Sequence, residues 1–223
     1  MMPLVALLHL SDSLFPIGAF GYSDGLEAAA SAGLIRTPSD LRAWLDVCLD
    51  QSIGGADGLA VLQACVAFNH GDWSTLATLD SEIHALRPSS GARRASRAMG
   101  LRLATTWQTL HPDRGMEELI ARVGARGPTL AIAFGCACAS VGIDHRDAAA
   151  AFAYTRLAST ISAAMRVMPI GQTDAHAQLA GVLRRIPATI DAMAGRTDPE
   201  SFAPAMDIAL MAQPYLQSRL FRT

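Results

Sequence analysis

The sequence predicts an all-α protein, a single-domain bundle of about ten helices with apolar central helices. Alanine, the strongest helix former, is very abundant, and hydrophobic residues make up 51% of the chain while aromatic residues make up only 6%. Apolar residues recur at helical spacing, as in Leu41, Trp44, Leu45, Cys48 and Leu49. No stretch alternates β-branched and polar residues with the period of two that is typical of a strand.

The first half of the chain divides into helices at clear start and stop signals. A short helix around Val5 and Leu8 precedes a glycine-rich stretch. We expect the next helix to begin at Asp24, as N-cap of a capping box with Glu27, and to end at Gly33. Thr37-Pro38 predicts a further helix start, and Gly54-Gly55 predicts a break. Later helices are expected at 57–70, 72–86 and 92–110.

The second half contains the most apolar elements. Residues 116–123 predict a short amphipathic helix, and residues 129–141 are apolar nearly all round, as expected of a central helix. A long helix is expected over 144–168, with Asp144 as its cap. Helices are then expected over 172–186 and from the Arg196–Pro199 stretch to about Pro214, with Pro187 as a kink or boundary.

The chain of 223 residues is long enough for one domain with a large core. We therefore expect a single domain over 1–223, with residues 1–22 as a flexible N-terminal segment and residues 215–223 as a flexible tail.

Composition excludes several classes of function. The net charge is −2 and the pI is near 6.3, so the chain has no basic footprint for nucleic acid. All 18 basic residues are arginine, which excludes lysine chemistry. Four cysteines without a secretory signal indicate a reducing, cytoplasmic compartment, and no segment is long and apolar enough for a membrane span.

No group of residues predicts catalysis, a cofactor or a metal site. Cys136 and Cys138 stand two apart near His145, but on a helix these thiols diverge by about 200°, which favours buried packing over metal binding. The six histidines are scattered without the i, i+4 spacing of a metal pair. We expect no catalytic, cofactor or metal residues, although a triad assembled in space and a transient nickel ligand stay open alternatives.

Two arginines interrupt the long apolar helix over 144–168. Arg156 and Arg166 are explained either as surface residues whose stems cover apolar neighbours, or as interface arginines with a carboxylate or backbone partner. The corner at Pro169–Gly171 follows, and Thr173 or Asp174 is expected to cap the next helix. The amide of Gln172 either satisfies carbonyls of the corner or faces a partner.

The stretch from Asp12 to Glu27, DSLFPIGAFGYSDGLE, is the most informative of the chain. It combines one proline and three glycines with aromatic residues, which is costly to order and is not typical of a core helix. One interpretation is a turn that only positions the following helix; the other is a functional segment. The nucleotide-binding glycine patterns do not fit it.

The same stretch resembles the N-terminal signature of the UreF family of urease accessory proteins. Three further segments are similar to this family, in the family's order: Ser96–Gly100 with Leu103, Ala133–Gly135, and Ser162 through Arg166 to Asp174. Together they span about Leu8 to Leu183. Two departures stand out: Thr129–Ala131 replaces a frequent His-Xaa-Pro, and Ala175-His176 replaces a frequent Gly-Gln.

This resemblance implies a non-enzymatic, usually homodimeric scaffold. It implies bridging of a UreD-like (UreH-like) protein and a UreG-like GTPase, with regulation of the GTPase, while nickel is inserted into apo-urease. Under this hypothesis the Phe15–Ser23 segment lies near the UreD-like contact, and Arg166 and Gln172 support the corner or an interface. The expected interface residues are Phe15, Pro16, Gly18, Phe20, Tyr22, Ser23, Glu27, Arg166, Gln172 and Thr173.

The alternative is an enzyme or a small-ligand-binding protein with an apolar pocket that the glycine-rich N-terminal segment closes. That alternative predicts a deep cavity with converging polar groups, whereas a scaffold predicts a broad exposed apolar patch.

Overall fold

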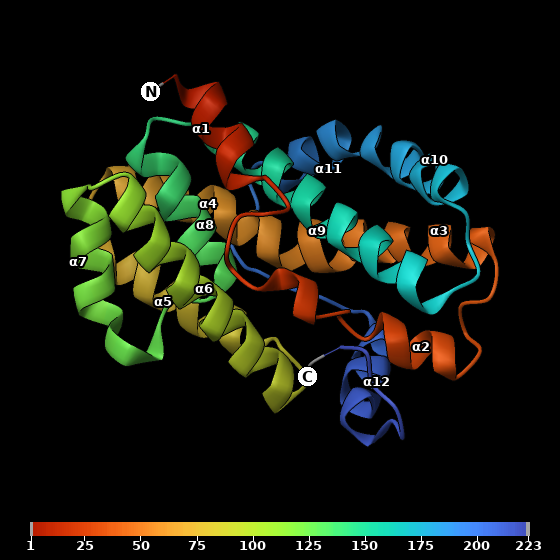
Figure 1. Cartoon of the computed structure of the whole chain (residues 1–223). Helices are drawn as coiled ribbons and strands as arrows, with labels where there is room; N and C mark the ends of the chain where they lie inside the picture. The colour runs from red at the N-terminus through yellow and green to blue at the C-terminus, as the bar shows by residue number, and fades with distance from the viewer. Residues whose placement is uncertain (1, 222–223) are drawn as a thin grey trace.

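The computed structural model describes residues 2–221 and confirms the all-α prediction, since no β-strand occurs among these residues (Figure 1). The helices match the expected number of about ten, because α3 and α4 are parts of one continuous rod. The α-helices are α1 Pro3–Leu10, α2 Leu26–Ser31, α3 Pro38–Val47, α4 Gly58–Asn69, α5 Trp73–Ala85, α6 Ser90–Leu110, α7 Arg114–Val123, α8 Leu130–Ser140, α9 His145–Val167, α10 Gln172–Leu183, α11 Ile186–Met193 and α12 Pro204–Ala212.

Capping side chains begin five of the twelve described α-helices, namely α3, α5, α6, α7 and α9. Thr37 and Asp40 form a reciprocal capping box at α3, with Pro38 in its first turn. The side chains of Asp72 and Asp144 accept backbone N–H groups at the starts of α5 and α9, as expected. These polar contacts satisfy backbone donors that the first helical turn leaves free.

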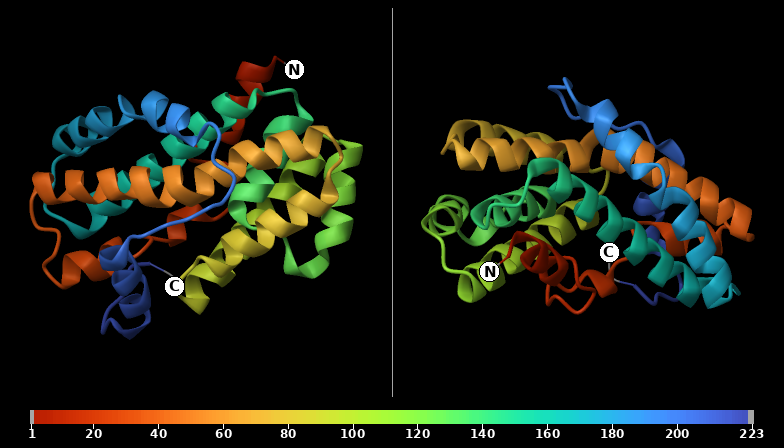
Figure 2. Two further views of the ribbon diagram at one scale, coloured as in Figure 1. Left: turned by 180° about the vertical axis from the view of Figure 1, so that it is seen from behind. Right: turned by 90° about the horizontal axis from the view of Figure 1, so that it is seen from above.

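The break predicted at Gly54-Gly55 is wrong. A π-helical stretch, η2 (Cys48–Asp57), joins α3 to α4, and the resulting long rod crosses the molecule (Figure 2). The backbone of Glu200 packs directly against this stretch: its N–H donates to the Gly55 carbonyl at 2.9 Å, and a Cβ on Gly55 would lie 2.3 Å from the Glu200 carbonyl oxygen. Gly55 therefore serves a close backbone approach rather than a turn.

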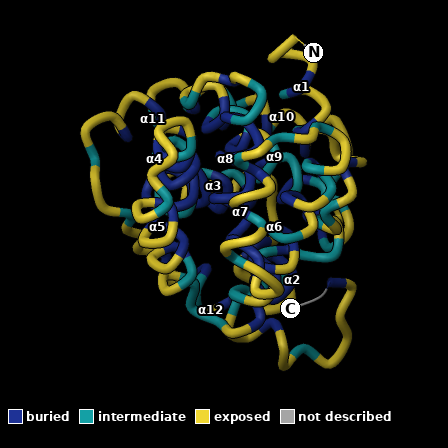
Figure 3. The backbone as a smooth tube through the Cα atoms, turned by 90° about the vertical axis from the view of Figure 1, so that its left-hand side faces the viewer, coloured by how far each residue is buried: buried dark blue, intermediate teal, exposed yellow. Residues whose placement is uncertain are grey.

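The apolar helices lie at the centre, as the sequence predicts. Every residue of α8 from Leu130 to Ala139 is buried, and Figure 3 shows the interior segments in dark blue beneath an exposed outer layer. α8 packs between α4 and α6, while α9 packs against α4 and α10. Two core clusters result, one around α4, α6 and α8, the other around α2, α3, α9 and α10.

The last helix begins later than expected. Residues 196–203 are not helical but cross the rod, where the Gln63 amide donates to the carbonyl oxygens of Arg196 and Thr197. α12 starts at Pro204, and a 3₁₀ turn, η4 (Gln213–Tyr215), follows it. Pro187 lies in the first turn of α11, which confirms it as a boundary.

Within residues 2–221, none of the helices has the length and apolar character that crossing a membrane would require. The flexibility expected for 1–22 and 215–223 stays a prediction, and for residue 1 and residues 222–223 it lies outside the described residues.

Candidate partner interface

The N-terminal segment, residues 12–23, runs beside α9 from α1 towards α2 (Figure 1). Phe15 anchors it: this ring is buried and packs at 6.1 Å from the Trp107 ring. Pro16 is exposed, and Gly18 takes a positive φ of 79°, which a glycine tolerates, before a short 3₁₀ turn. The Phe20 ring remains 51% exposed, so this segment presents apolar surface on a buried anchor.

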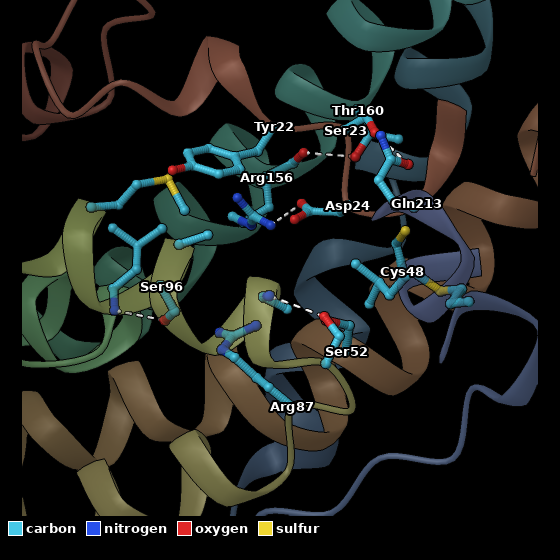
Figure 4. Close-up of a pocket in the computed structure, with 18 of the residues that line it drawn as sticks. Tyr22, Ser23, Asp24, Cys48, Ser52, Arg87, Ser96, Arg156, Thr160 and Gln213 are labelled. Atoms are coloured by element: carbon cyan, nitrogen blue, oxygen red, sulfur yellow. Dashed lines mark hydrogen bonds and ion pairs between the residues drawn. The ribbon is translucent and has the colours of Figure 1, made fainter. Parts of the chain in front are cut away.

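The second half of the segment lines a small cavity of about 80 Å³ (Figure 4). Tyr22 lines this cavity, and buried Ser23 lies 3.5 Å from the side-chain oxygen of Gln213. The predicted capping box at α2 is wrong. Gly25 is the N-cap, and Asp24, at a positive φ of 50°, pairs with Arg156 of α9 instead.

Arg156 therefore has the carboxylate partner that one interpretation required, but the partner lies within the same chain. Burial lowers the pKa of the Arg156 guanidinium, and the charges of Asp24 and Asp57 outweigh burial and leave this pKa above its ordinary value. The pair joins the strained turn before α2 to the middle of α9, which fixes the exit of the N-terminal segment.

Glu27 holds the C-terminal tail. Its carboxylate accepts the side-chain N–H of Gln213 at 2.7 Å, and the backbone N–H groups of Leu220 at 2.6 Å and Phe221 at 3.3 Å. Glu27 itself is buried, so these three donors replace water around its charge. We call this group, Glu27 with Gln213, Leu220 and Phe221, the Glu27 clasp.

Arg166 connects the N-terminal segment to the tail. Its guanidinium donates to the carbonyl oxygen of Phe20 at 3.2 Å and lies 4.2 Å from the centre of the Phe221 ring. The side chain is exposed in the last turn of α9. The structure thus brings Phe20, Arg166 and the Glu27 clasp together on one side of α9.

Gln172 and Thr173 lie apart from this assembly. Both are exposed at the start of α10, and neither side chain forms a hydrogen bond with another described residue. The predicted cap at Thr173 or Asp174 is wrong, because Gly171 is the N-cap and no side chain caps α10. Gln172 does not satisfy the carbonyls of the corner, which leaves its role at a partner as the surviving hypothesis.

Two residues of this assembly, Gln213 and Phe221, were not identified from the sequence. Gln213 is separated from Glu27 by 186 positions, and Phe221 by 194. No local spacing relates such distant residues. The only local sign is that Glu27 is charged in an otherwise apolar helix start, where a buried carboxylate needs donors.

The thiols are not prepared for metal binding or nucleophilic chemistry. Burial raises the pKa of Cys48 and of Cys65 to about 12, and raises the pKa values of Cys136 and Cys138 above their ordinary value. A thiol must lose its proton to bind a metal or to attack a substrate. Among residues 2–221, no three His, Cys, Asp or Glu side chains gather in a way that could hold a metal ion.

An apolar groove of about 520 Å³ lies between the N-terminal segment and α9. Phe15 and Ile17 line one wall, and Ile161 and Met165 of α9 line the other. Asp12, Arg156 and His176 are polar residues at its border. The exposed Phe20 ring and this groove give the N-terminal side of the molecule an apolar surface of the kind typical of binding and accessory proteins.

Comparison with known sequences agrees with this class. The sequence model of the UreF family matches residues 35–183. Among similar relatives, a urease accessory protein UreF of Methylibium petroleiphilum is 31% identical, with 99% of this chain and 94% of the relative covered. A UreF of Azoarcus is 30% identical over 100% of this chain and 97% of the relative. A bifunctional urease accessory protein UreEF of Bordetella bronchiseptica is 31% identical over 99% of this chain and 52% of its own length.

The chain belongs to the UreF family of urease accessory proteins. The resemblance stated from the sequence motifs is thereby confirmed. The relatives are named as accessory proteins and not as enzymes, which agrees with the expected non-enzymatic role. The N-terminal signature lies before residue 35 and so outside the stretch that the family model matches, whereas the similarity to the relatives extends over nearly the whole chain.

Proposed function

We propose that this chain is a non-catalytic scaffold that bridges a UreD-like (UreH-like) protein and a UreG-like GTPase during insertion of nickel into apo-urease. Membership of the UreF family is the observation that carries this proposal. The scaffold works in the cytoplasm and as a homodimer, as the resemblance implies. It acts by differential binding, because a scaffold that binds one nucleotide state of the GTPase more tightly shifts its population by that difference in affinity.

The surface of the N-terminal segment supports this function. Leu14 is 82% exposed and Phe20 is 51% exposed, and Leu4, Val5 and Leu8 of α1 are also exposed. Grouped apolar side chains on a protein surface are typical of sites that a partner covers. We therefore assign the UreD-like contact to the N-terminal segment, with Arg166 behind it and Gln172 and Thr173 at a separate contact.

The name of one relative points to a further partner. The Bordetella relative is named a bifunctional urease accessory protein UreEF, and this chain covers 52% of it. A separate UreE-like protein is for that reason a further partner to include in any reconstitution.

Co-expression tests the scaffold directly. The tagged chain is purified from cells that also produce the UreD-like and UreG-like proteins of its source, and light scattering measures the mass of the product. We expect a stable ternary complex in at least one nucleotide state. Absence of any complex in the apo, GDP-bound and GTP-bound states would contradict the scaffold function.

Three variants test where the UreD-like protein binds. Leu14→Asp with Phe20→Asp puts charge on the exposed apolar side chains and is expected to lower the complex yield at least tenfold while the chain stays folded. Leu34→Asp is the matched control, because Leu34 is 59% exposed beyond the end of α2. Equal losses in both variants would sink the assignment to the N-terminal segment. Arg166→Glu tests whether Arg166 contributes to binding. An unchanged yield of the complex would show that Arg166 is not part of the interface.

The groove beneath the N-terminal segment favours a second function, the binding of a small apolar ligand. Its volume of about 520 Å³ lies in the range of ligand pockets. A fluorescent fatty acid titrated into the purified chain tests it. Saturable binding that Met165→Asp abolishes would support a ligand pocket, and the absence of binding would leave the groove to a protein partner.

A further inference from the structure

A second surface feature lies on α6, outside the partner interface described above. The groove between α6, the end of α5 and the turn η3 (Gly124–Arg126) has a volume of about 600 Å³. We call it the arginine groove. Its lining residues are His84, Ser90, Arg93, Arg94, Arg97, Ala98, Leu101, Ala125 and Arg126. It therefore presents four arginines and, among the described lining residues, no carboxylate.

One of the four arginines is structural. Arg97 is buried and donates to the carboxylate of Asp80 and, at 2.7 Å, to the carbonyl oxygen of Gly127. The Asp80 carboxylate is nearly inaccessible and also accepts the backbone N–H of Thr129 at 2.7 Å. The charge of Asp80, which lies beneath the groove, is thus already compensated by Arg97.

The other three arginines carry charge that no described carboxylate matches closely. Arg93 donates to the backbone carbonyl oxygen of Arg87, which leaves its charge uncompensated. Arg94 forms no hydrogen bond or ion pair with the described residues. Arg126 is 61% exposed and reaches Asp80 only at 3.8 Å. Three guanidinium groups therefore have donors available to a ligand.

His84 lines the groove beside these arginines, and its pKa is lowered. Burial lowers the pKa of His84 first, and the charges of Arg97 and Arg93 lower it further. Its Nδ1 atom is buried and has no hydrogen-bond partner among the described residues. A groove lined by arginines is suited to an anionic ligand.

We propose that the arginine groove binds an acidic segment of a partner protein through guanidinium–carboxylate pairs to Arg93, Arg94 and Arg126. The groove is open and follows one face of α6, where Ser90, Arg93, Arg94 and Arg97 recur at helical spacing, so it suits an extended chain. The guanidinium fork matches a carboxylate in two hydrogen bonds.

Nucleic acid is the less suitable occupant. The whole chain has a net charge of −2 and a pI near 6.3, and the groove's lining contains no Phe, Tyr or Trp on which a base could stack. An acidic peptide needs neither feature, because side-chain carboxylates on a short segment can reach all three guanidinium groups.

The test measures the anisotropy of a rhodamine-labelled hexaglutamate peptide titrated with the full chain at low salt. We expect saturable binding that weakens as salt is raised, because exposed charges are screened. Replacing Arg93, Arg94 and Arg126 by Gln should raise the Kd at least tenfold. The matched control replaces Arg36 and Arg184, exposed arginines outside the groove, by Gln and should change the Kd less than twofold.

Circular dichroism melts verify that both variants remain folded, and Arg97 is left intact because it is part of the core. Equal Kd values for the wild type and the groove variant would overturn the proposal. An oligonucleotide (dT12) that binds more tightly than the peptide, and loses binding in the groove variant, would overturn the acidic-segment occupant in favour of nucleic acid. Complete competition by equimolar inorganic phosphate would likewise reduce the groove to a simple anion site.

Discussion

Two buried carboxylates, Asp80 and Glu27, organise two regions of the molecule in different ways. Asp80 on α5 pairs with the cationic Arg97 and the N–H of Thr129, all within the core around α8. Glu27 accepts three neutral N–H donors, two of them from the backbone of the tail. The first carboxylate joins helices that are already packed, whereas the second holds a segment with little packing of its own.

This difference indicates which part of the fold can open locally. Loss of one partner of a buried ion pair leaves the other charge unmatched and affects the whole domain. Loss of a contact at the edge releases only the segment it holds, because local opening needs far less free energy than global unfolding. The Glu27 clasp lies beside Arg166 and Phe20, so the release of the tail would alter the proposed partner surface.

The largest expected effect is on global stability. Asp80→Ala leaves Arg97 buried without its carboxylate, and we expect the free energy of unfolding in urea to fall by about 3–5 kcal/mol. Asp191→Ala removes the exposed partner of Arg146 and is the control, with an expected loss below about 1 kcal/mol. Equal losses in the two variants would show that the Asp80 pair has no special weight.

The second effect is local. Glu27→Ala removes all three acceptor contacts of the clasp, and we expect trypsin to cleave after Arg219 at least tenfold faster, with a global loss of about 1–3 kcal/mol. Glu27→Gln keeps one acceptor oxygen and should lie between the wild type and the alanine variant. Cleavage at the wild-type rate in Glu27→Ala would mean that the clasp does not hold the tail.

A smaller effect is expected at Arg166. Arg166→Ala removes the contact with the Phe221 ring and the hydrogen bond to Phe20, each of which is worth about 1 kcal/mol or less at an exposed site. The same trypsin assay should show faster cleavage than in the wild type but slower than in Glu27→Ala. The reverse order would place the main hold on the tail at Arg166.

The smallest effect is a pH dependence at the end of α6. The rings of His111 and Trp107 lie tilted against each other with their centres 4.2 Å apart. Burial, and then the charge of His9, lower the pKa of His111 from its ordinary value of 6.5. The unfolded chain therefore binds more protons near that pH, so stability is complete above about pH 6.5 and declines as the pH falls below it. The urea midpoint should fall less on acidification in His111→Gln than in the wild type. Parallel curves would exclude His111 as the source.

The sequence predicted the local features of the fold well, because caps and helical periodicity depend on neighbours. Thr37 with Asp40 and the apolar run of α8 are examples. The errors arose where distant residues decide. Gly54-Gly55 is typical of a break, yet the Glu200 backbone packs on it; Asp24 is typical of a cap, yet Arg156, 132 positions away, takes its carboxylate.

The site followed the same rule. The motif of the N-terminal segment was visible in the sequence because its glycines and aromatic residues are adjacent. Its link to the tail was not, since Glu27 and Phe221 lie at opposite ends of the chain. Arg166 was singled out as unusual within an apolar helix, but only the folded chain shows that it connects both ends.

Hydrogen exchange, measured on the chain alone and on the chain bound to the UreD-like protein, tests whether the N-terminal segment and the tail held by the Glu27 clasp form one partner surface. We expect residues 12–23 and 214–221 to become protected together on binding, while the protection of the ends of α3 and α10 stays the same. Protection confined to other helices, with both segments exchanging as in the free chain, would contradict it.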